Sequence, residues 1–166
     1  NIKLKINWGF TSRGCIRKCE FCFVPKKEGL IRPVGDIYDV WDGKGKDIVI
    51  MDNNILALKD HFKKICSQIR KEKLCVDFNQ GLDLRLLNDE FVRELKTIRH
   101  KEYKFAWDNV DDEMVGRLEY VYKNLRRCTI FVICGFPNDN FDEVMRKFEI
   151  IKKIGHNGYA MRYENF

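Results

Sequence analysis

Short apolar runs alternate along this chain with amphipathic segments of helical period. The runs that predict β-strands are residues 6–11, 47–51, 74–78, 103–107, 129–134 and 159–162. Between them, apolar side chains recur every three or four positions, which is typical of helices that bury one face. Such helices are predicted at 36–41, at 58–69, after Asn88, after Asp111 and at 141–154. This repeated strand–helix order predicts an α/β fold.

The predicted strands are continuously apolar rather than alternating in polarity. Strands of this kind are typical of parallel sheets that are buried on both faces and joined by right-handed crossovers. Six strand–helix units form either an open sheet or an incomplete barrel, and a doubly wound order is the main alternative. The 166 residues predict one domain, residues 1–166. Because the first residue is Asn1, it stays open whether the chain is a piece of a longer protein.

The composition is that of an ordinary globular protein, with 45% apolar and 34% charged residues and a net charge of +6. No apolar run approaches the roughly 20 residues that a membrane span needs, and no signal peptide is visible. We therefore expect no membrane partner. Seven cysteines without a disulfide framework predict a reducing compartment, hence a cytoplasmic protein.

Three cysteines, Cys15, Cys19 and Cys22, lie close together in the spacing C-x3-C-x2-C. Thiolates are the soft, anionic ligands that iron–sulfur clusters use. If the segment is a loop, three thiolates can bind three irons of a [4Fe–4S] cube. The fourth iron then stays open for chemistry, much as a catalytic zinc keeps a vacant position.

A structural zinc site is an alternative interpretation of these cysteines. Such a site needs a fourth ligand and usually pairs two short clusters. The sequence has no second CxxC, and its histidines, His61, His100 and His156, fit no ligand pattern. A disulfide pair is also open, although seven is an odd number and the other four cysteines lie in apolar runs.

Cationic residues surround the cysteine segment: Arg13, Arg17, Lys18, Lys26, Lys27 and Arg32. A solvated rim and a functional surface are equally consistent with this pattern. A functional surface would attract an acidic electron donor or a phosphate-bearing substrate. The sequence does not favour one of these over the other.

Polar or turn-forming residues follow each apolar run after the first. They are Asp52, Asn53, Asn54, Asn79, Gln80, Asp83, Arg85, Asp108, Asn109, Gly135, Pro137 and Arg162. Turn preferences explain some of them. Because barrel enzymes carry their chemistry at the carboxyl ends of parallel strands, we expect others to line a shared site.

The cysteine spacing, with Phe21 directly before the third cysteine, resembles the signature of the radical S-adenosylmethionine (SAM) superfamily. The resemblance implies a partial (β/α)6 TIM-like barrel of parallel strands with outer helices. In that fold the cysteine loop follows the first strand, as it does in this chain. The resemblance covers essentially the whole chain, residues 1–166, as a single radical SAM core domain.

The resemblance also implies an activity. A [4Fe–4S] cluster on Cys15, Cys19 and Cys22 would reductively cleave SAM to a 5′-deoxyadenosyl radical, which abstracts hydrogen from a substrate. A low-potential donor such as flavodoxin or ferredoxin would supply the electron. The substrate is open, and a nucleic acid such as tRNA, a peptide or a metabolite is permitted. The alternative function is a non-catalytic iron–sulfur or zinc module for electron transfer or structure.

Contacts to the amine group of SAM are expected after the second strand. Relatives often carry Gly-Gly-Glu there, whereas this chain has Met-Asp-Asn-Asn. We expect the Asp52 carboxylate to accept the ammonium, with Asn53 and Asn54 as further acceptors. After the third strand, Gln80 is expected to face the same pocket.

Contacts to the rest of SAM are expected from other strand ends. Asp108 is the candidate for the ribose hydroxyls, and Gly135 with the backbone of Phe21 for the adenine. Arg85 and Arg162 are candidates for a carboxylate on the substrate or on the cofactor.

Overall fold

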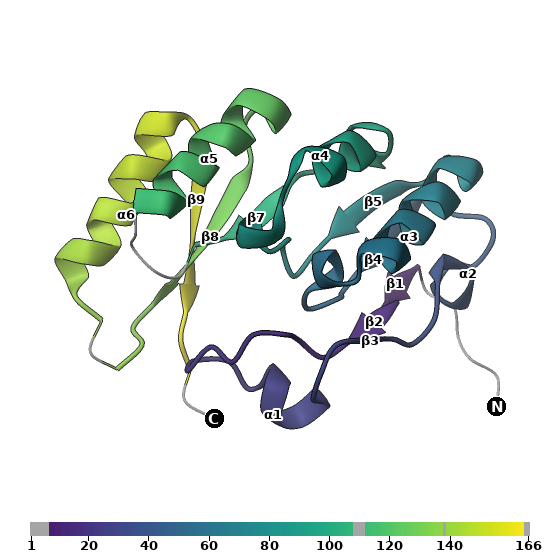
Figure 1. The fold of residues 1–166 in the computed structure, drawn as a ribbon, viewed down its shortest axis with the longest axis horizontal. Helices are drawn as coiled ribbons and strands as arrows, with labels where there is room; N and C mark the ends of the chain where they lie inside the picture. Colours follow the sequence, from purple (N-terminus) through teal and green to yellow (C-terminus); the bar gives the residue numbers. More distant parts are fainter. Residues whose placement is uncertain (1–6, 108–111, 138, 165–166) are drawn as a thin grey trace.

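The computed structural model describes residues 7–107, 112–137 and 139–164, and it is an α/β structure (Figure 1). The strands are β1 (Trp8–Gly9), β2 (Ser12–Arg13), β3 (Arg32–Pro33), β4 (Asp47–Ile50), β5 (Cys75–Phe78), β6 (Arg99–His100), β7 (Lys104–Ala106), β8 (Thr129–Cys134) and β9 (Asn157–Arg162). The helices are α1 (Val24–Glu28), α2 (Ile37–Val40), α3 (Lys59–Glu72), α4 (Asp89–Lys96), α5 (Asp112–Leu125) and α6 (Phe141–Ile154), with 3₁₀ turns η1 (Ile55–Ala57) and η2 (Leu84–Leu86).

The sheet strands are parallel and follow one another in chain order. One sheet has the order β1-β4-β5-β6 and another the order β7-β8-β9, and every pairing in both is parallel. A parallel bridge between Leu82 and Phe105 links the segment after β5 to β7. A doubly wound sheet reverses its strand order at a switch point, and this order has no such reversal.

The predicted elements are confirmed, with one difference at the first strand. The expected strand over residues 6–11 is short in the structure, and the chain leaves the sheet after Gly9. It then forms β2, which precedes the cysteine segment. β2 pairs antiparallel with β3, which follows that segment in the sequence. This small hairpin brings the two ends of the cysteine segment together.

Helices α3 to α6 lie on one side of the strands, and the cysteine segment and α1 lie on the other (Figure 1). Strand side chains that face these helices, such as Ile50, Val76 and Val132, are fully buried. The opposite face is more open, because Tyr159 is 58% exposed and Trp8 is 51% exposed. The expected burial of both faces is therefore wrong for the described residues, because the crossovers place their helices on one side.

The helices begin and end where their sequences predict. Asn88 caps α4 by accepting a hydrogen bond from the Phe91 amide (3.0 Å). Gly155 ends α6 in a left-handed conformation (φ 107°). Cys66 and Cys128 are fully buried, and burial raises the pKa of each thiol to about 12. These two thiols belong to the core, as expected.

No helix within the described part of the chain has the length and apolar character needed to cross a membrane.

His156 is a buried part of this core and is held in its neutral form. Its Nδ1 accepts a hydrogen bond from the Cys128 amide (3.2 Å), which leaves Nε2 to donate to the Leu118 carbonyl (2.9 Å). Burial lowers the pKa of His156 and outweighs the hydrogen bond to Leu118, which acts to raise it. Burial also lowers the pKa of His61 and His100.

We therefore expect the protein to lose stability as the pH falls below the ordinary histidine pKa of 6.5. Below that pH the unfolded chain binds protons that the folded chain does not, so the free energy of unfolding decreases. Each histidine contributes at most about 1.4 kcal/mol per pH unit. Urea denaturation between about pH 7.5 and pH 5.5 measures this slope. His156→Gln should reduce the slope, and an unchanged slope would contradict the role given to this ring.

Candidate functional site

The three cysteines lie on an irregular loop between β2 and α1. Residues 14–23 form no helix or strand, and a turn joins the Cys22 amide to the Cys19 carbonyl (3.0 Å). Cys15, Cys19 and Cys22 are partly exposed, and none is in a disulfide. The expectation that this segment is a loop is confirmed.

Glu28 closes the base of this loop. Its carboxylate accepts hydrogen bonds from the Gly14 amide (2.9 Å) and from Asn53 Nδ2 (2.9 Å), and it pairs with Arg13 (2.5 Å). The Cys15 amide donates to the Gly29 carbonyl (3.2 Å) beside it. Glu28 thus joins both ends of the loop to the end of β4. No sequence motif marks Glu28 as a site residue, because its only local signal is an acidic side chain just before Gly29.

Asp52, at the end of β4, binds the segment that enters the loop. Its carboxylate accepts hydrogen bonds from the Thr11 amide (2.6 Å), the Thr11 hydroxyl (2.6 Å) and the Ser12 hydroxyl (2.7 Å). The Thr11 hydroxyl also lies 3.1 Å from His61 Nε2. Asp52 is only 4% exposed, so these contacts give it a structural role. Its expected contact with the SAM ammonium stays a prediction.

Replacing Asp52 with asparagine should lower the free energy of unfolding by about 2 kcal/mol, because a hydrogen bond to a buried charge is worth more than a neutral one. Thermal or urea denaturation measures the loss. Asp47→Asn is a matched control, because Asp47 is 65% exposed and its pair with Lys101 is on the surface. Equal stabilities of the two variants would show that the Asp52 contacts contribute little.

Asn54 lies deeper at the end of β4 and contacts the first cysteine. Its Nδ2 donates to Asp83 Oδ2 (3.0 Å) and lies 3.6 Å from the Cys15 sulfur. The Cys15 sulfur and the Asp83 oxygen both accept hydrogen bonds. The Asn54 side chain must therefore turn its NH2 group, and not its oxygen, toward them. The Asn54 oxygen is buried and has no hydrogen-bond partner among the described residues. A buried acceptor of this kind is suited to a donor group on a ligand.

Asp83 connects the cysteine loop to the segment after β5. It accepts hydrogen bonds from Arg17 Nε (3.0 Å), Arg85 Nε (2.8 Å) and the Arg85 amide (3.1 Å), besides Asn54. Burial alone would raise the pKa of Asp83, but the hydrogen bonds from Arg85 and Arg17 outweigh it and lower the pKa. Asp83 therefore stays ionised and holds three segments together.

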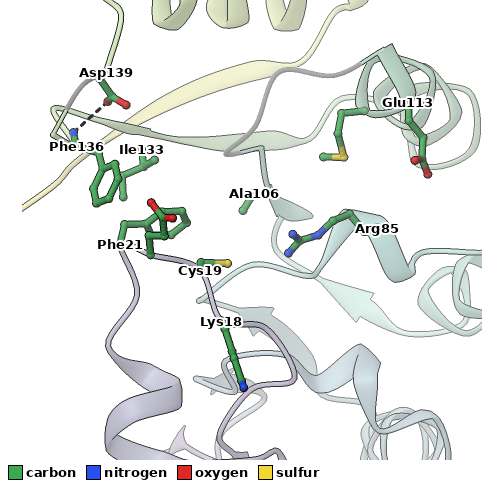
Figure 2. Close-up of a pocket in the computed structure, with 11 residues that line it drawn as sticks. Lys18, Cys19, Phe21, Arg85, Ala106, Glu113, Ile133, Phe136 and Asp139 are labelled. Carbon is green, nitrogen blue, oxygen red and sulfur yellow. Dashed lines mark hydrogen bonds between the residues drawn. The ribbon is translucent and has the colours of Figure 1, made fainter.

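A cavity of about 480 Å³ lies beside the loop (Figure 2). Its walls come from the cysteine loop, the segment after β5, the ends of β7 and β8, and α5. The lining residues are Lys18, Cys19, Glu20, Phe21, Arg85, Ala106, Glu113, Met114, Ile133, Phe136 and Asp139. Phe21 and Phe136 meet edge to face with ring centroids 6.1 Å apart. Figure 2 shows the sulfur of Cys19 on the side of the cavity toward Arg85.

The structure brings some of the predicted site residues together and leaves others apart. Cys19, Phe21 and Arg85 share the cavity. Gln80 and Gly135 are exposed in turns after their strands, and Arg162 is exposed at the end of β9. Asp108 and Asn109 lie outside the described residues. The cavity also includes residues that no sequence motif marks as site residues: Glu20, Ala106, Glu113, Met114, Ile133 and Asp139.

Two of the expected rim cations turn inward to ion pairs. Arg13 pairs with Glu28, and Arg17 pairs with Asp83. Lys18, Lys26, Lys27 and Arg32 stay exposed around the loop. Two of the cations around the loop therefore have structural partners, and the other four face solvent.

The three thiols are not gathered around one point. Within residues 7–107, 112–137 and 139–164, no group of three or more His, Cys, Asp or Glu side chains is placed to hold a metal ion. The donor set nevertheless fits an iron–sulfur cluster in kind, since it is three thiols on one loop. Because no helix or strand includes residues 14–23, the thiols can converge while Glu28 holds the ends of the loop.

No protein-family model matches this chain, and no curated protein matches it either. The residues of the site therefore carry the functional assignment.

Proposed function

We propose that this chain is the core of a radical SAM enzyme, with a [4Fe–4S] cluster held by Cys15, Cys19 and Cys22. The observation that carries the proposal is the place of the cysteine loop. Its thiols are partly exposed, and Cys19 lines a cavity that is also lined from the ends of two parallel strands. When bound, the cluster would supply the electron that cleaves SAM to methionine and a 5′-deoxyadenosyl radical.

The proposal extends to the fold, which we infer to be a partial (β/α)6 TIM-like barrel. Parallel pairing in chain order supports it, because a singly wound sheet has this order. The helices on one side of the strands support it as well (Figure 1). The more open face of the strands would then line the interior of the barrel.

The residues around the loop have distinct roles in this proposal. The unpartnered oxygen of Asn54 would accept a hydrogen bond from the ammonium of SAM. Arg85, held at the cavity by Asp83, would face a carboxylate. Phe21 and Phe136 would contact an apolar ring such as adenine. Together these groups would orient the cofactor and exclude water from the site.

The exposed cations around the loop support a docking site for an acidic, low-potential electron donor such as flavodoxin or ferredoxin. Four basic side chains are exposed at the surface on which the cluster would lie: Lys18, Lys26, Lys27 and Arg32. A substrate with phosphate groups, such as tRNA, would use the same cations. The substrate itself is not identified by these residues.

Electron paramagnetic resonance tests the proposal on anaerobically reconstituted and reduced protein, with and without SAM. A cluster signal that changes when SAM is added is the expected result, because the open iron then binds the cofactor. A signal that SAM does not alter would assign the cluster to electron transfer or structure. Uptake of zinc without any cluster would overturn the proposal and favour a structural metal site.

A further inference from the structure

The sulfur of Cys15 lies among hydrogen-bond donors that the chain places around it. The Arg17 amide donates to this sulfur at 3.3 Å, and Asn54 Nδ2 lies 3.6 Å from it. The amide comes from the cysteine loop itself, whereas Asn54 comes from the end of β4. Donors of this kind withdraw electron density from a thiolate that binds a cluster, and they stabilise the reduced state.

Asp83 contacts both of the residues that carry these donors. It accepts a hydrogen bond from the second proton of the Asn54 amide, which directs the Asn54 nitrogen toward the sulfur. It also binds the side chain of Arg17, whose backbone amide is the other donor. The Asp83 side chain is only 5% exposed, so water competes little for these contacts. A single carboxylate therefore binds both residues whose N–H groups lie at the Cys15 sulfur.

We propose that Asp83 is a positioning residue that acts through Asn54 and Arg17 on the Cys15 sulfur and raises the reduction potential of a cluster bound there. This inference rests on the proposed function, because it needs the cluster to be present. Asp83 would act on the sulfur only through the two residues that it binds. A purely structural role for Asp83 would change how much cluster the protein retains but not the potential of the cluster that remains.

The test is a redox titration, followed by paramagnetic resonance, of reconstituted wild-type protein and of Asp83→Glu. Glutamate keeps the negative charge, so the local charge at the cluster does not change, but its longer side chain displaces the carboxylate from its contacts with Arg17 and Asn54. We expect the midpoint potential of the cluster in Asp83→Glu to shift to a more negative value. Asp47→Glu is the matched control, because this exposed carboxylate lies on β4 and pairs only with Lys101 among the described ion pairs.

Asn54→Ala tests the same path without changing Asp83. It removes the side-chain donor and should shift the potential in the same direction. Because both residues act on one sulfur, the shift in the double variant should be smaller than the sum of the two single shifts. This variant keeps the inference testable if Asp83→Glu does not fold.

The outcomes separate this inference from the proposed function. A wild-type cluster that responds to SAM, together with unchanged potentials in Asp83→Glu and Asn54→Ala, would overturn the inference and leave the proposed function in place. A wild-type protein that takes up no cluster would overturn both. A negative shift in Asp83→Glu and Asn54→Ala, with Asp47→Glu like the wild type, is the supporting result.

Discussion

Replacing Cys19 with alanine is expected to leave the protein folded but unable to retain a [4Fe–4S] cluster. Cys19 is partly exposed on an irregular loop, so the loss of its sulfur removes little buried surface. Binding of the cluster should weaken greatly, because only two of the three proposed thiolate ligands remain. Iron and sulfide per chain after anaerobic reconstitution measure the effect, and SAM cleavage should fall to background.

Cys134→Ala is the matched control for this variant. Cys134 lies at the end of β8, outside the cysteine loop, and its sulfur donates to the Val132 carbonyl (3.4 Å). Burial raises the pKa of the Cys134 thiol, so it is less readily deprotonated to the thiolate that binds metal. We expect Cys134→Ala to retain a full cluster. A full cluster in Cys19→Ala would contradict the ligand assignment.

Replacing Gly14 with alanine is expected to be the most damaging substitution in the loop that does not touch a thiol. Gly14 has a φ of +86°, which disfavours any residue with a Cβ atom. An added Cβ atom would also lie 2.6 Å from the Gly29 carbonyl oxygen and 2.5 Å from that of Leu30. These are backbone atoms at the base of the loop, so they cannot move without opening it.

Gly43→Ala separates the two contributions. Gly43 has nearly the same φ, +82°, but an added Cβ atom would meet nothing within 4 Å. Gly43→Ala should therefore lower the free energy of unfolding only through the unfavourable backbone conformation, by about 1–2 kcal/mol. Gly14→Ala should lower the free energy of unfolding by about 1–3 kcal/mol more than Gly43→Ala does, because the added Cβ atom overpacks the site.

Urea denaturation compares the two glycine variants, and iron content after reconstitution shows the effect on the loop. We expect Gly14→Ala to retain much less cluster than Gly43→Ala, because opening the base of the loop separates Cys15 from its neighbours. Equal stability and equal iron content in the two variants would show that the close approach of Gly14 to Gly29 and Leu30 is unimportant.

Local patterns along the chain are enough to predict most helices and strands. The apolar stripe and the asparagine cap of α4, and the run that forms β8, each depend on neighbouring residues alone. The limits of the cysteine segment are also partly local, because Gly14 begins it with a positive φ and Pro25 marks the first turn of the helix that follows. The spacing of the three thiols, and with it the proposed cluster chemistry, is present in the sequence itself.

Tertiary structure decides which residues surround those thiols. Glu28 binds Gly14 and Asn53, and Asp83 binds Arg17 across 66 positions of the chain. These partners depend on how β4 and β5 lie beside the loop, which no local pattern contains.

The open face of the strands was decided in the same way. An apolar strand has the same sequence signature whether one or both of its faces are covered, and the coverage depends on which side the crossover helices take. The sequence by itself therefore determined the elements and the thiol spacing, because these follow from short-range periodicity. Only the tertiary structure decided the hydrogen bonds at Cys15 and the cavity beside Cys19, because contacts between distant segments form when the parallel strands assemble.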